Sequence, residues 1–301
     1  MLGFSPRHGV LYAVVLIAAM LAVAHAAIFV RLADADPLVI AAYRMLIAAL
    51  ALLPFALMLA RDQIRALTIR EWGLIAVASV FLALHFATWI EGVARTSIAN
   101  AVVLVTLTPV WLALWSVLAL RKSPGWRIWL AVGLAVGGGA VMAWGSVQIG
   151  MATLIGDGLA LAGGILFAAF FLVTDKARRS VGLVAFITLV YAGAAVLLWI
   201  PVLALDLPVA GFSRETYFAL VAIGLISQVV GHSGFNWAVR TISPMFLALL
   251  FLAEPILSTA LGWIYFREGF GLATVLGGVL ILGAIYLGMG SARVNQSTQT
   301  R

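Results

Sequence analysis

The sequence predicts an all-α polytopic membrane protein whose ten transmembrane helices form two inverted five-helix repeats. Composition, the length of the apolar runs and the distribution of positive charge predict this fold. Of the 301 residues, 64% are hydrophobic and 10% are charged, whereas a soluble domain has about 25% charged residues. The mean hydropathy of +1.16 therefore requires lipid around most of the exterior.

Apolar runs of about 20 residues, the length of a membrane-spanning helix, follow one another along the chain. Lipid offers no hydrogen-bond partner, so a segment that crosses it must be a helix or part of a closed barrel. Barrel strands are about 10 residues long and alternate apolar and polar positions, which these runs do not. The predicted helices are Val10–Val30, Pro37–Ala60, Trp72–Ala94, Ser97–Leu120, Trp126–Trp144, Gly156–Thr174, Leu183–Leu205, Thr216–Ala238, Met245–Phe266 and Ala273–Gly290.

The first run also has some features of a secretory signal peptide. It follows basic residues, and Ala24–Ala26 resembles a cleavage site. However, the run is long for the apolar core of a signal peptide, and the internal repeat needs it as its first helix. We therefore expect a retained transmembrane helix, with cleavage as the alternative.

Positive charge is distributed unevenly between alternate loops. With a cytoplasmic amino terminus, four basic residues fall on the outer side: Arg31, Arg95, Arg214 and Arg267. Thirteen fall on the inner side: Arg7, Arg61, Arg65, Arg70, Arg121, Lys122, Arg127, Lys176, Arg178, Arg179, Arg240, Arg293 and Arg301. Arg44 lies within a span. Such an inner excess is typical of membrane proteins, so we expect an even number of helices and both termini in the cytoplasm, in a bacterial inner membrane.

The two halves of the chain repeat one another. Arg95-Thr96 recurs as Arg240-Thr241 after 145 residues, and Gly9 and Pro54 match Gly156 and Pro201 after 147. At an offset of 146, Leu104, Pro109, Arg121, Gly125, Leu130, Leu134 and Gly137 recur as Leu250, Pro255, Arg267, Gly271, Leu276, Leu280 and Gly283. Because five is odd, the second half enters the membrane from the opposite side, an arrangement typical of transporters with a site between the halves. We predict repeats over 1–145 and 146–292 and a disordered cytoplasmic tail over 293–301.

Several short motifs stand out in the chain: Pro255, Gly262-Trp263, Glu268, Gly277-Gly278 and Asn236-Trp237-Ala238 in the second half and Tyr43-Arg44 in the first. Together they resemble the EamA type of the drug/metabolite transporter superfamily. Lys122 departs from the pattern, because the first half usually carries a Glu there. The resemblance covers essentially the whole chain and implies a ten-helix secondary carrier that exports amino acids or related metabolites. Among the branches, the YddG-like aromatic amino-acid exporters are the most similar.

Polar and aromatic side chains in three spans predict a substrate cavity near the membrane midplane. Residues four apart share a helix face, and polar groups inside a membrane usually face the protein interior. The candidate cavity residues are His85, Trp89, Thr108, Trp111, Trp115, Gln228, His232 and Asn236. The alternatives are hydrogen bonds between helices for the polar groups and packing or lipid contact for the aromatic ones. A mostly apolar pocket with a few polar anchors suits a neutral or aromatic amino acid.

Glu254 lies within the ninth run, next to Pro255. A proline frees a backbone carbonyl one turn earlier, and this local opening can accommodate a protonated carboxyl. Glu254 is therefore the candidate for proton coupling, and the alternative is a structural pair with a buried base, such as Arg44, or with a backbone group. The sequence leaves open whether transport is proton antiport or facilitated diffusion.

The predicted function is transport rather than catalysis, with no cofactor and no metal. The alternatives are an efflux carrier for drug-like or cationic compounds and, in a different class, an integral membrane enzyme. The four histidines are scattered without the H-E-x-x-H spacing of a metal site, and cysteine is absent. The first span carries His25 and no acid, which disfavours cation efflux, and we expect His25 to be structural. A small-molecule substrate and the lipid bilayer are the expected partners, with no nucleic acid. We expect a monomer.

Overall fold

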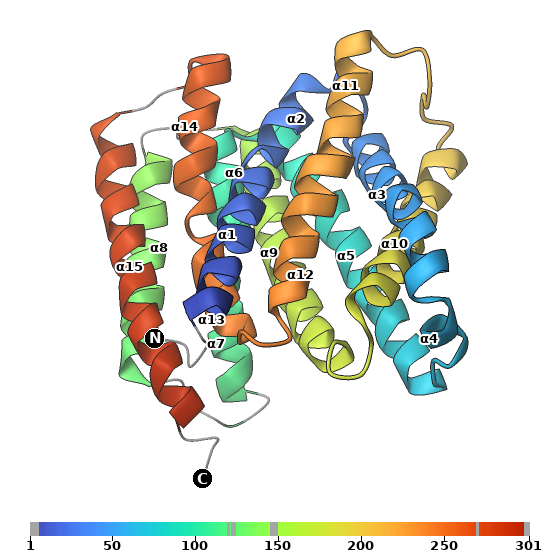
Figure 1. The fold of residues 1–301 in the computed structure, drawn as a ribbon. Coiled ribbons are helices and arrows are strands. Elements are labelled where there is room, and N and C mark those ends of the chain that lie inside the picture. Colours follow the sequence, from blue (N-terminus) through green and yellow to red (C-terminus); the bar gives the residue numbers. More distant parts are fainter. Residues whose placement is uncertain (1–5, 119–120, 122–124, 145–149, 269–270, 298–301) are drawn as a thin grey trace.

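The chain folds into a bundle of membrane-length helices (Figure 1). The computed structural model describes residues 6–118, 121, 125–144, 150–268 and 271–297, so Lys122 and the predicted boundary at 145/146 lie outside the described residues. Within them, nine helical segments are long and apolar enough to span a membrane, and Leu272–Gly288 adds a shorter apolar helix. These are the ten helices that the sequence predicts, and the described residues contain no strand.

The ten spans follow the predicted order, and four of them are divided by a break or by a change in helix type. The undivided spans are α3 (Pro37–Leu59), α5 (Ile69–Arg95), α8 (Trp126–Trp144), α9 (Met151–Ala177), α10 (Leu183–Ala204) and α15 (Leu272–Ser297). The divided spans are α1 (Pro6–Ala24) with α2 (Ala26–Leu32), α6 (Ile98–Val105) with α7 (Thr108–Leu118), α11 (Arg214–Ala222) with η1 (Ile223–His232) and α12 (Ser233–Ala238), and α13 (Pro244–Phe251) with α14 (Glu254–Phe266). A short helix, α4 (Arg61–Arg65), lies between α3 and α5.

Helix α15 continues to Ser297, whereas the sequence predicts a disordered tail from Arg293. A helix satisfies its own backbone hydrogen bonds, so it can extend beyond the apolar segment without a packing partner. Residues 298–301 lie outside the described residues. The tail and the division into two domains stay predictions.

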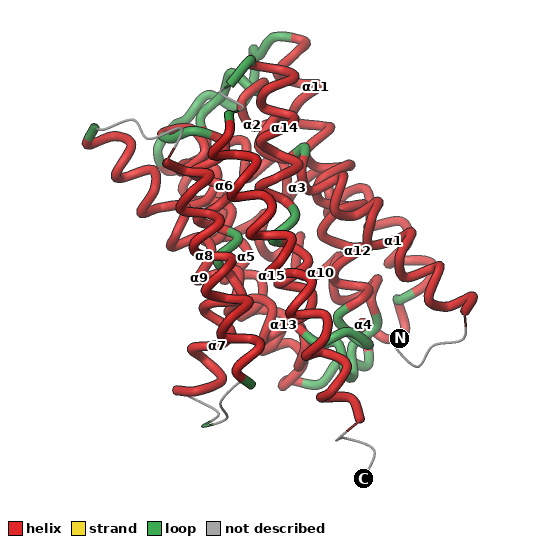
Figure 2. Tube along the Cα trace, turned by 90° about the vertical axis from the view of Figure 1, so that its left-hand side faces the viewer, coloured by secondary structure: helices red, strands yellow, loops and turns green. Residues whose placement is uncertain are grey.

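The packing of the spans has the symmetry of an inverted repeat. Helix α3 packs on α10 and α8 packs on α15, and each of these pairs joins equivalent spans of the two halves. Helix α1 of the first span packs on η1 of the eighth, and α9 of the sixth span packs on α5 of the third. These two contacts are equivalent, because the first span corresponds to the sixth and the third to the eighth. Figure 1 places the ends of α2 and α14 at one end of the bundle and α4 and α13 at the other, and Figure 2 shows loops gathered at both ends. Exchanging the halves therefore reproduces the main contacts.

Equivalent irregularities in the fourth and ninth spans show the same repeat. The fourth span breaks before Pro109 and the ninth before Pro255, because a proline lacks the N–H that would continue the helical ladder. Arg121 and Arg267, also 146 residues apart, both have a positive φ, of 50° and 55°. This left-handed conformation commonly ends a helix. The sequence repeat therefore extends to backbone conformation.

The eighth span departs from this symmetry. Segment η1 is a π-helix, whereas α5, the equivalent span of the first half, is α-helical throughout. A π-helix bonds residues five apart, so residues four apart rotate away from a common face. The prediction that Gln228, His232 and Asn236 share one face requires a regular α-helix. The eighth span is not regular here, so the spacing of four no longer implies a common face.

Glycines allow α8 and α15 to cross closely. A Cβ atom at Gly138 would lie 2.7 Å from the carbonyl oxygen of Gly277, and a Cβ atom at Gly277 would meet the carbonyl oxygen of Gly138. Gly133 and Gly137 take no part in this crossing, because neither has another group within 4 Å of an added Cβ. One residue along a helix changes direction by about 100°, so Gly138 faces α15 and Gly137 does not.

Gly138→Ala and Gly133→Ala are expected to change stability in opposite directions. The added methyl at residue 138 forces the α8–α15 backbones apart, which costs about 1–3 kcal/mol. At residue 133 it meets open space, and alanine in a helix is favoured over glycine by about 0.5–1 kcal/mol. Thermal unfolding of the detergent-solubilised protein measures both effects. Equal melting temperatures for the two variants would contradict the proposed crossing.

Candidate functional site

A buried cavity lies between the two halves of the bundle. Spans one to four and spans six, eight and nine contribute to its wall. The lining residues are Val23, Ala26, Arg44, His85, Phe86, Trp89, Val105, Thr106, Thr108, Phe167, His232, Phe251 and Glu254. The cavity volume is about 20 Å³, which is room for about one water molecule. A substrate can therefore enter only when the surrounding helices separate.

Two helix breaks place polar groups at this cavity. In the fourth span, α6 and α7 meet at Thr106, and in the ninth span α13 and α14 meet just before Glu254. Pro109 and Pro255 follow the breaks and prevent a continuous helix. Thr108 and Glu254 occupy equivalent positions in the two halves, and both line the cavity. The repeat thus supplies a hydroxyl on one side and a carboxyl on the other.

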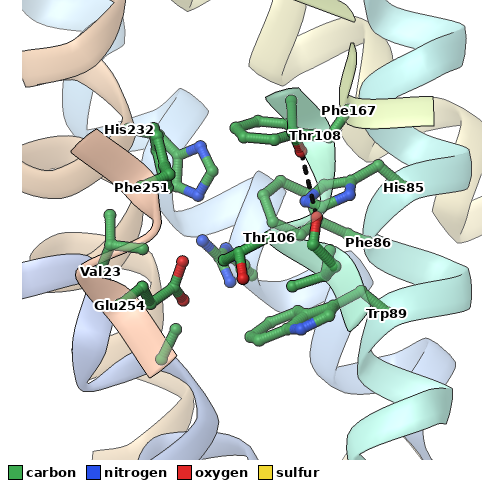
Figure 3. Close-up of a pocket in the computed structure, with 13 residues that line it drawn as sticks. Val23, His85, Phe86, Trp89, Thr106, Thr108, Phe167, His232, Phe251 and Glu254 are labelled. Atoms are coloured by element: carbon green, nitrogen blue, oxygen red, sulfur yellow. Dashed lines mark hydrogen bonds between the residues drawn. The ribbon is translucent and has the colours of Figure 1, made fainter. Parts of the chain in front are cut away.

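Aromatic rings form most of the cavity wall: His85, Phe86, Trp89, Phe167, His232 and Phe251. The His85 ring stacks on Phe167 with centroids 4.6 Å apart, and His232 meets Phe86 edge-on at 5.3 Å. Figure 3 shows Glu254, His232 and Phe251 on one side of the cavity, opposite His85, Phe86 and Trp89. These contacts provide flat apolar surfaces on both sides.

His85 is fixed by the backbone of the second half. Its Nδ1 atom lies 2.9 Å from the carbonyl oxygen of Gly163 on α9. Because a carbonyl oxygen only accepts hydrogen bonds, Nδ1 carries a proton. The bond sets the orientation of the His85 ring against Phe167.

Arg44 is the buried base of the cavity, with 0% of its surface exposed. Its Nε donates a hydrogen bond to Gln228 Oε1 at 2.8 Å, and its Cζ lies 3.9 Å from the centroid of the Phe86 ring. Both Nη atoms are buried without a hydrogen-bond partner. Leaving such donors unpaired costs free energy, so they are available for a ligand.

Glu254 is the buried acid of the same cavity, with 4% of its surface exposed. It makes no direct ion pair with Arg44, which is the structural pairing that the sequence offered as an alternative. The ion pairs of the described residues lie elsewhere: Arg31–Glu268, Arg95–Glu91 and Arg179–Asp175. The acid and the base therefore line one space without direct contact.

The structure places five of the nine predicted site residues at the cavity: His85, Trp89, Thr108, His232 and Glu254. It does not place Gln228, Asn236, Trp111 or Trp115 in the wall. Gln228 lies behind Arg44 as its hydrogen-bond partner. The side-chain amide of Asn236 donates a hydrogen bond to the Tyr191 hydroxyl at 3.3 Å.

The two tryptophans of α7 lie beyond the cavity. Trp111 packs beside the small buried cluster of Leu112, Ala168 and Ala248, and Trp115 is 50% exposed on the outside of the bundle. They follow Thr108 by about one and two helical turns. A shared helix face gives residues a common direction but not a common depth, which is why the spacing argument fails for these two.

Sequence reasoning missed Thr106 and the three phenylalanines Phe86, Phe167 and Phe251. Phenylalanine is common throughout these apolar runs, so its presence carries no local signal. Arg44 did carry a signal, because it is the one arginine or lysine that lies in a predicted span away from the ends of that span. Its role in the cavity could not be assigned without the packing of α3 against α5 and η1.

Arg31 connects three spans at one end of the bundle. Its Nε donates to the Val93 carbonyl oxygen at 3.0 Å, its Nη1 lies 3.4 Å from Glu268 Oε1, and its Nη2 contacts the Thr96 carbonyl oxygen. These bonds join α2 to the end of α5 and to Glu268, the second residue after α14. They must break if these spans separate there to admit a substrate.

A family model matches each half of the chain separately. The model of the EamA-like transporter family matches residues 9–144 and again residues 154–289. The chain belongs to the EamA-like transporter family. The family resemblance drawn from the sequence is thereby confirmed, as is the duplicated all-α membrane fold.

Relatives of this EamA-like transporter carry the same general description. It is 25% identical over 263 residues to an uncharacterized transporter of Archaeoglobus fulgidus, covering 86% of this chain and 89% of the relative. It is 24% identical over 255 residues to the uncharacterized transporter YdfC of Bacillus subtilis, covering 82% and 79%. A crystal structure of a protein with 16% identity matches with a TM-score of 0.75 over 94% of this chain and 97% of that one, which shows a shared fold.

Proposed function

We propose that this EamA-like transporter is a secondary carrier that exports neutral or aromatic amino acids by alternating access through the central cavity. The composition of the cavity wall carries the proposal: six aromatic rings surround two charged side chains and two threonines. A mostly apolar pocket with few polar groups suits such a ligand. Inverted halves around a central site can open alternately toward either side of the membrane.

A counterflow screen in proteoliposomes tests this proposal. Vesicles loaded with unlabelled phenylalanine, tryptophan or leucine are expected to accumulate the labelled amino acid transiently and saturably. Empty vesicles and vesicles loaded with a phosphorylated sugar serve as controls. Exchange restricted to charged or phosphorylated compounds would contradict the assignment.

Efflux of cationic or drug-like compounds is the second candidate function, and the cavity disfavours it. Arg44 faces the same space as the single acid, Glu254, and its fixed positive charge repels a cation. A sugar phosphate is disfavoured in turn, because Arg44 is the one strongly basic group at the cavity. The aromatic wall supports the YddG-like aromatic amino-acid exporter branch suggested by the sequence.

The proposed orientation places both termini in the cytoplasm of a bacterial inner membrane. The absence of natural cysteine allows single-cysteine labelling with an impermeant reagent. Asp206→Cys is expected to react from outside, and Arg65→Cys only after the membrane is opened; both positions are exposed. Arg178 is a poor reporter because it is buried and donates to the Asn236 and Val181 carbonyl oxygens. Labelling of intact cells at residue 65 would reverse the proposed topology.

We further propose that Glu254 couples transport to protons. The carboxyl shares its cavity with Arg44, His85 and His232, so a proton bound there alters the charge that a substrate meets. Glu254→Gln is expected to abolish the response of transport to a pH gradient and to preserve counterflow at reduced affinity, since the amide keeps an acceptor oxygen. Uptake into pH-jumped proteoliposomes measures the response. A variant with the full response would show that another group carries the proton.

A further inference from the structure

Arg44 and Glu254 are a buried base and a buried acid that line the same cavity without an ion pair between them. Both are at least nine-tenths buried, and both line the cavity. The two Nη atoms of Arg44 lack a hydrogen-bond partner, and among the described residues the Glu254 carboxyl has neither an ion-pair nor a hydrogen-bond partner. Buried charges are normally paired, so this arrangement indicates that the missing partner is a ligand.

The guanidinium of Arg44 is held with one edge occupied and one edge free. Gln228 Oε1 accepts from Nε at 2.8 Å, and the ring of Phe86 lies 3.9 Å from Cζ. Together these contacts fix the plane of the guanidinium and leave Nη1 and Nη2 without a protein partner. Paired N–H groups of arginine match the two oxygens of a carboxylate. Gln228 is thus a positioning residue for Arg44.

We propose that this pair of charges recognises the zwitterionic end of a free α-amino acid, with the substrate carboxylate on Arg44 and the substrate ammonium on Glu254. The inference rests on the proposed function and names the protein groups that bind the substrate. A zwitterion brings both complementary charges on one carbon atom and adds no net charge to the cavity. A simple cation would leave Arg44 unpaired, and a simple anion would leave Glu254 unpaired. The aromatic rings then contact the side chain of the amino acid.

Competition in the counterflow assay tests this recognition with wild-type protein. Labelled phenylalanine is the substrate, and the competitors are phenylalanine, phenylalaninamide, which lacks the carboxylate, and 3-phenylpropionate, which lacks the ammonium. All three share the same ring. Each analogue with a single charge is expected to need at least about a tenfold higher concentration than phenylalanine for half-inhibition, a difference of about 1.4 kcal/mol.

Two variants separate the roles of the charges. In Glu254→Gln, inhibition by phenylalanine is expected to weaken about tenfold, whereas inhibition by 3-phenylpropionate stays equal or strengthens. In Arg44→Gln, phenylalaninamide is expected to become as good a competitor as phenylalanine. A purely structural role would weaken all three competitors equally in both variants and would overturn the proposal.

Different results would contradict zwitterion recognition and amino-acid transport. If phenylalanine exchanges and both analogues compete equally well against the wild type, recognition of the zwitterion is wrong and amino-acid transport stands. If no amino acid exchanges, the proposed function is wrong and the zwitterion site falls with it. These outcomes come from the unmodified protein, so they do not depend on the folding of a variant.

Discussion

Glu254→Leu is expected to destabilise the transporter more than any other single substitution in the cavity. It leaves Arg44 buried without the acid that faces it across the cavity. Because the two side chains are not in contact, the lost attraction is expected to be below about 4 kcal/mol, the value that holds for charges about 4 Å apart. Arginine cannot relieve this cost by losing its proton. In the reciprocal variant Arg44→Leu, the carboxyl of Glu254 can take up a proton and become neutral, so a smaller loss is expected.

The double variant Arg44→Leu with Glu254→Leu is the matched control. Replacing both buried charges by apolar side chains is often neutral for stability, so most of the lost free energy of unfolding should return while transport stays absent. Unfolding of the purified protein in detergent and counterflow in proteoliposomes measure the two properties separately. A double variant as unstable as Glu254→Leu would show that the two charges do not interact across the cavity.

Trp89→Leu is expected to lower transport efficiency about two- to tenfold, whereas Trp115→Leu should leave it unchanged. Trp89 is 3% exposed, lines the cavity and lies with its ring 5.7 Å from Arg44 Cζ. The substitution removes an aromatic contact with the substrate, worth about 0.5–1.5 kcal/mol. Trp115 carries the same side chain on the outside of the bundle, where it is 50% exposed.

The comparison is read from kcat/KM for labelled phenylalanine, normalised to folded protein in the vesicles. Leucine keeps apolar bulk at both positions, so a difference between the variants reports on the cavity rather than on lipid contact. Equal losses would contradict a specific role for the Trp89 ring. If neither variant loses efficiency, the aromatic side chains of the cavity do not contribute to substrate binding.

The fold was predictable from sequence because the membrane imposes simple physical constraints. Every span must be apolar and helical, and the matches of Pro109 to Pro255 and Arg121 to Arg267 mark features of the backbone. These pairs correspond to equivalent breaks and equivalent left-handed residues in the structure. The apolar pattern of each span and the repeat between the two halves therefore predict the same fold.

The cavity was only partly predictable because it depends on depth and on local helix type. Helical spacing gives direction, so His85 and Trp89 were found, but it placed Trp115 at a site two turns away. In the π-helix η1, residues four apart do not share one face: His232 lines the cavity, whereas Gln228 contacts Arg44. No feature of the sequence signalled this change of helix type. The unpaired edge of Arg44 is likewise visible only once its neighbours are placed.

Substrate protection of a single cysteine at Thr106 tests the central claim, that the substrate occupies the cavity between the halves. Thr106 lines the cavity and is 3% exposed, and the natural sequence contains no cysteine. For Thr106→Cys that still exchanges phenylalanine, saturating phenylalanine is expected to slow modification by a small membrane-permeant thiol reagent about tenfold. Asp206→Cys, at the end of the bundle, should react at the same rate with and without substrate. An unchanged rate at residue 106 in a transporting variant would contradict a substrate site in this cavity.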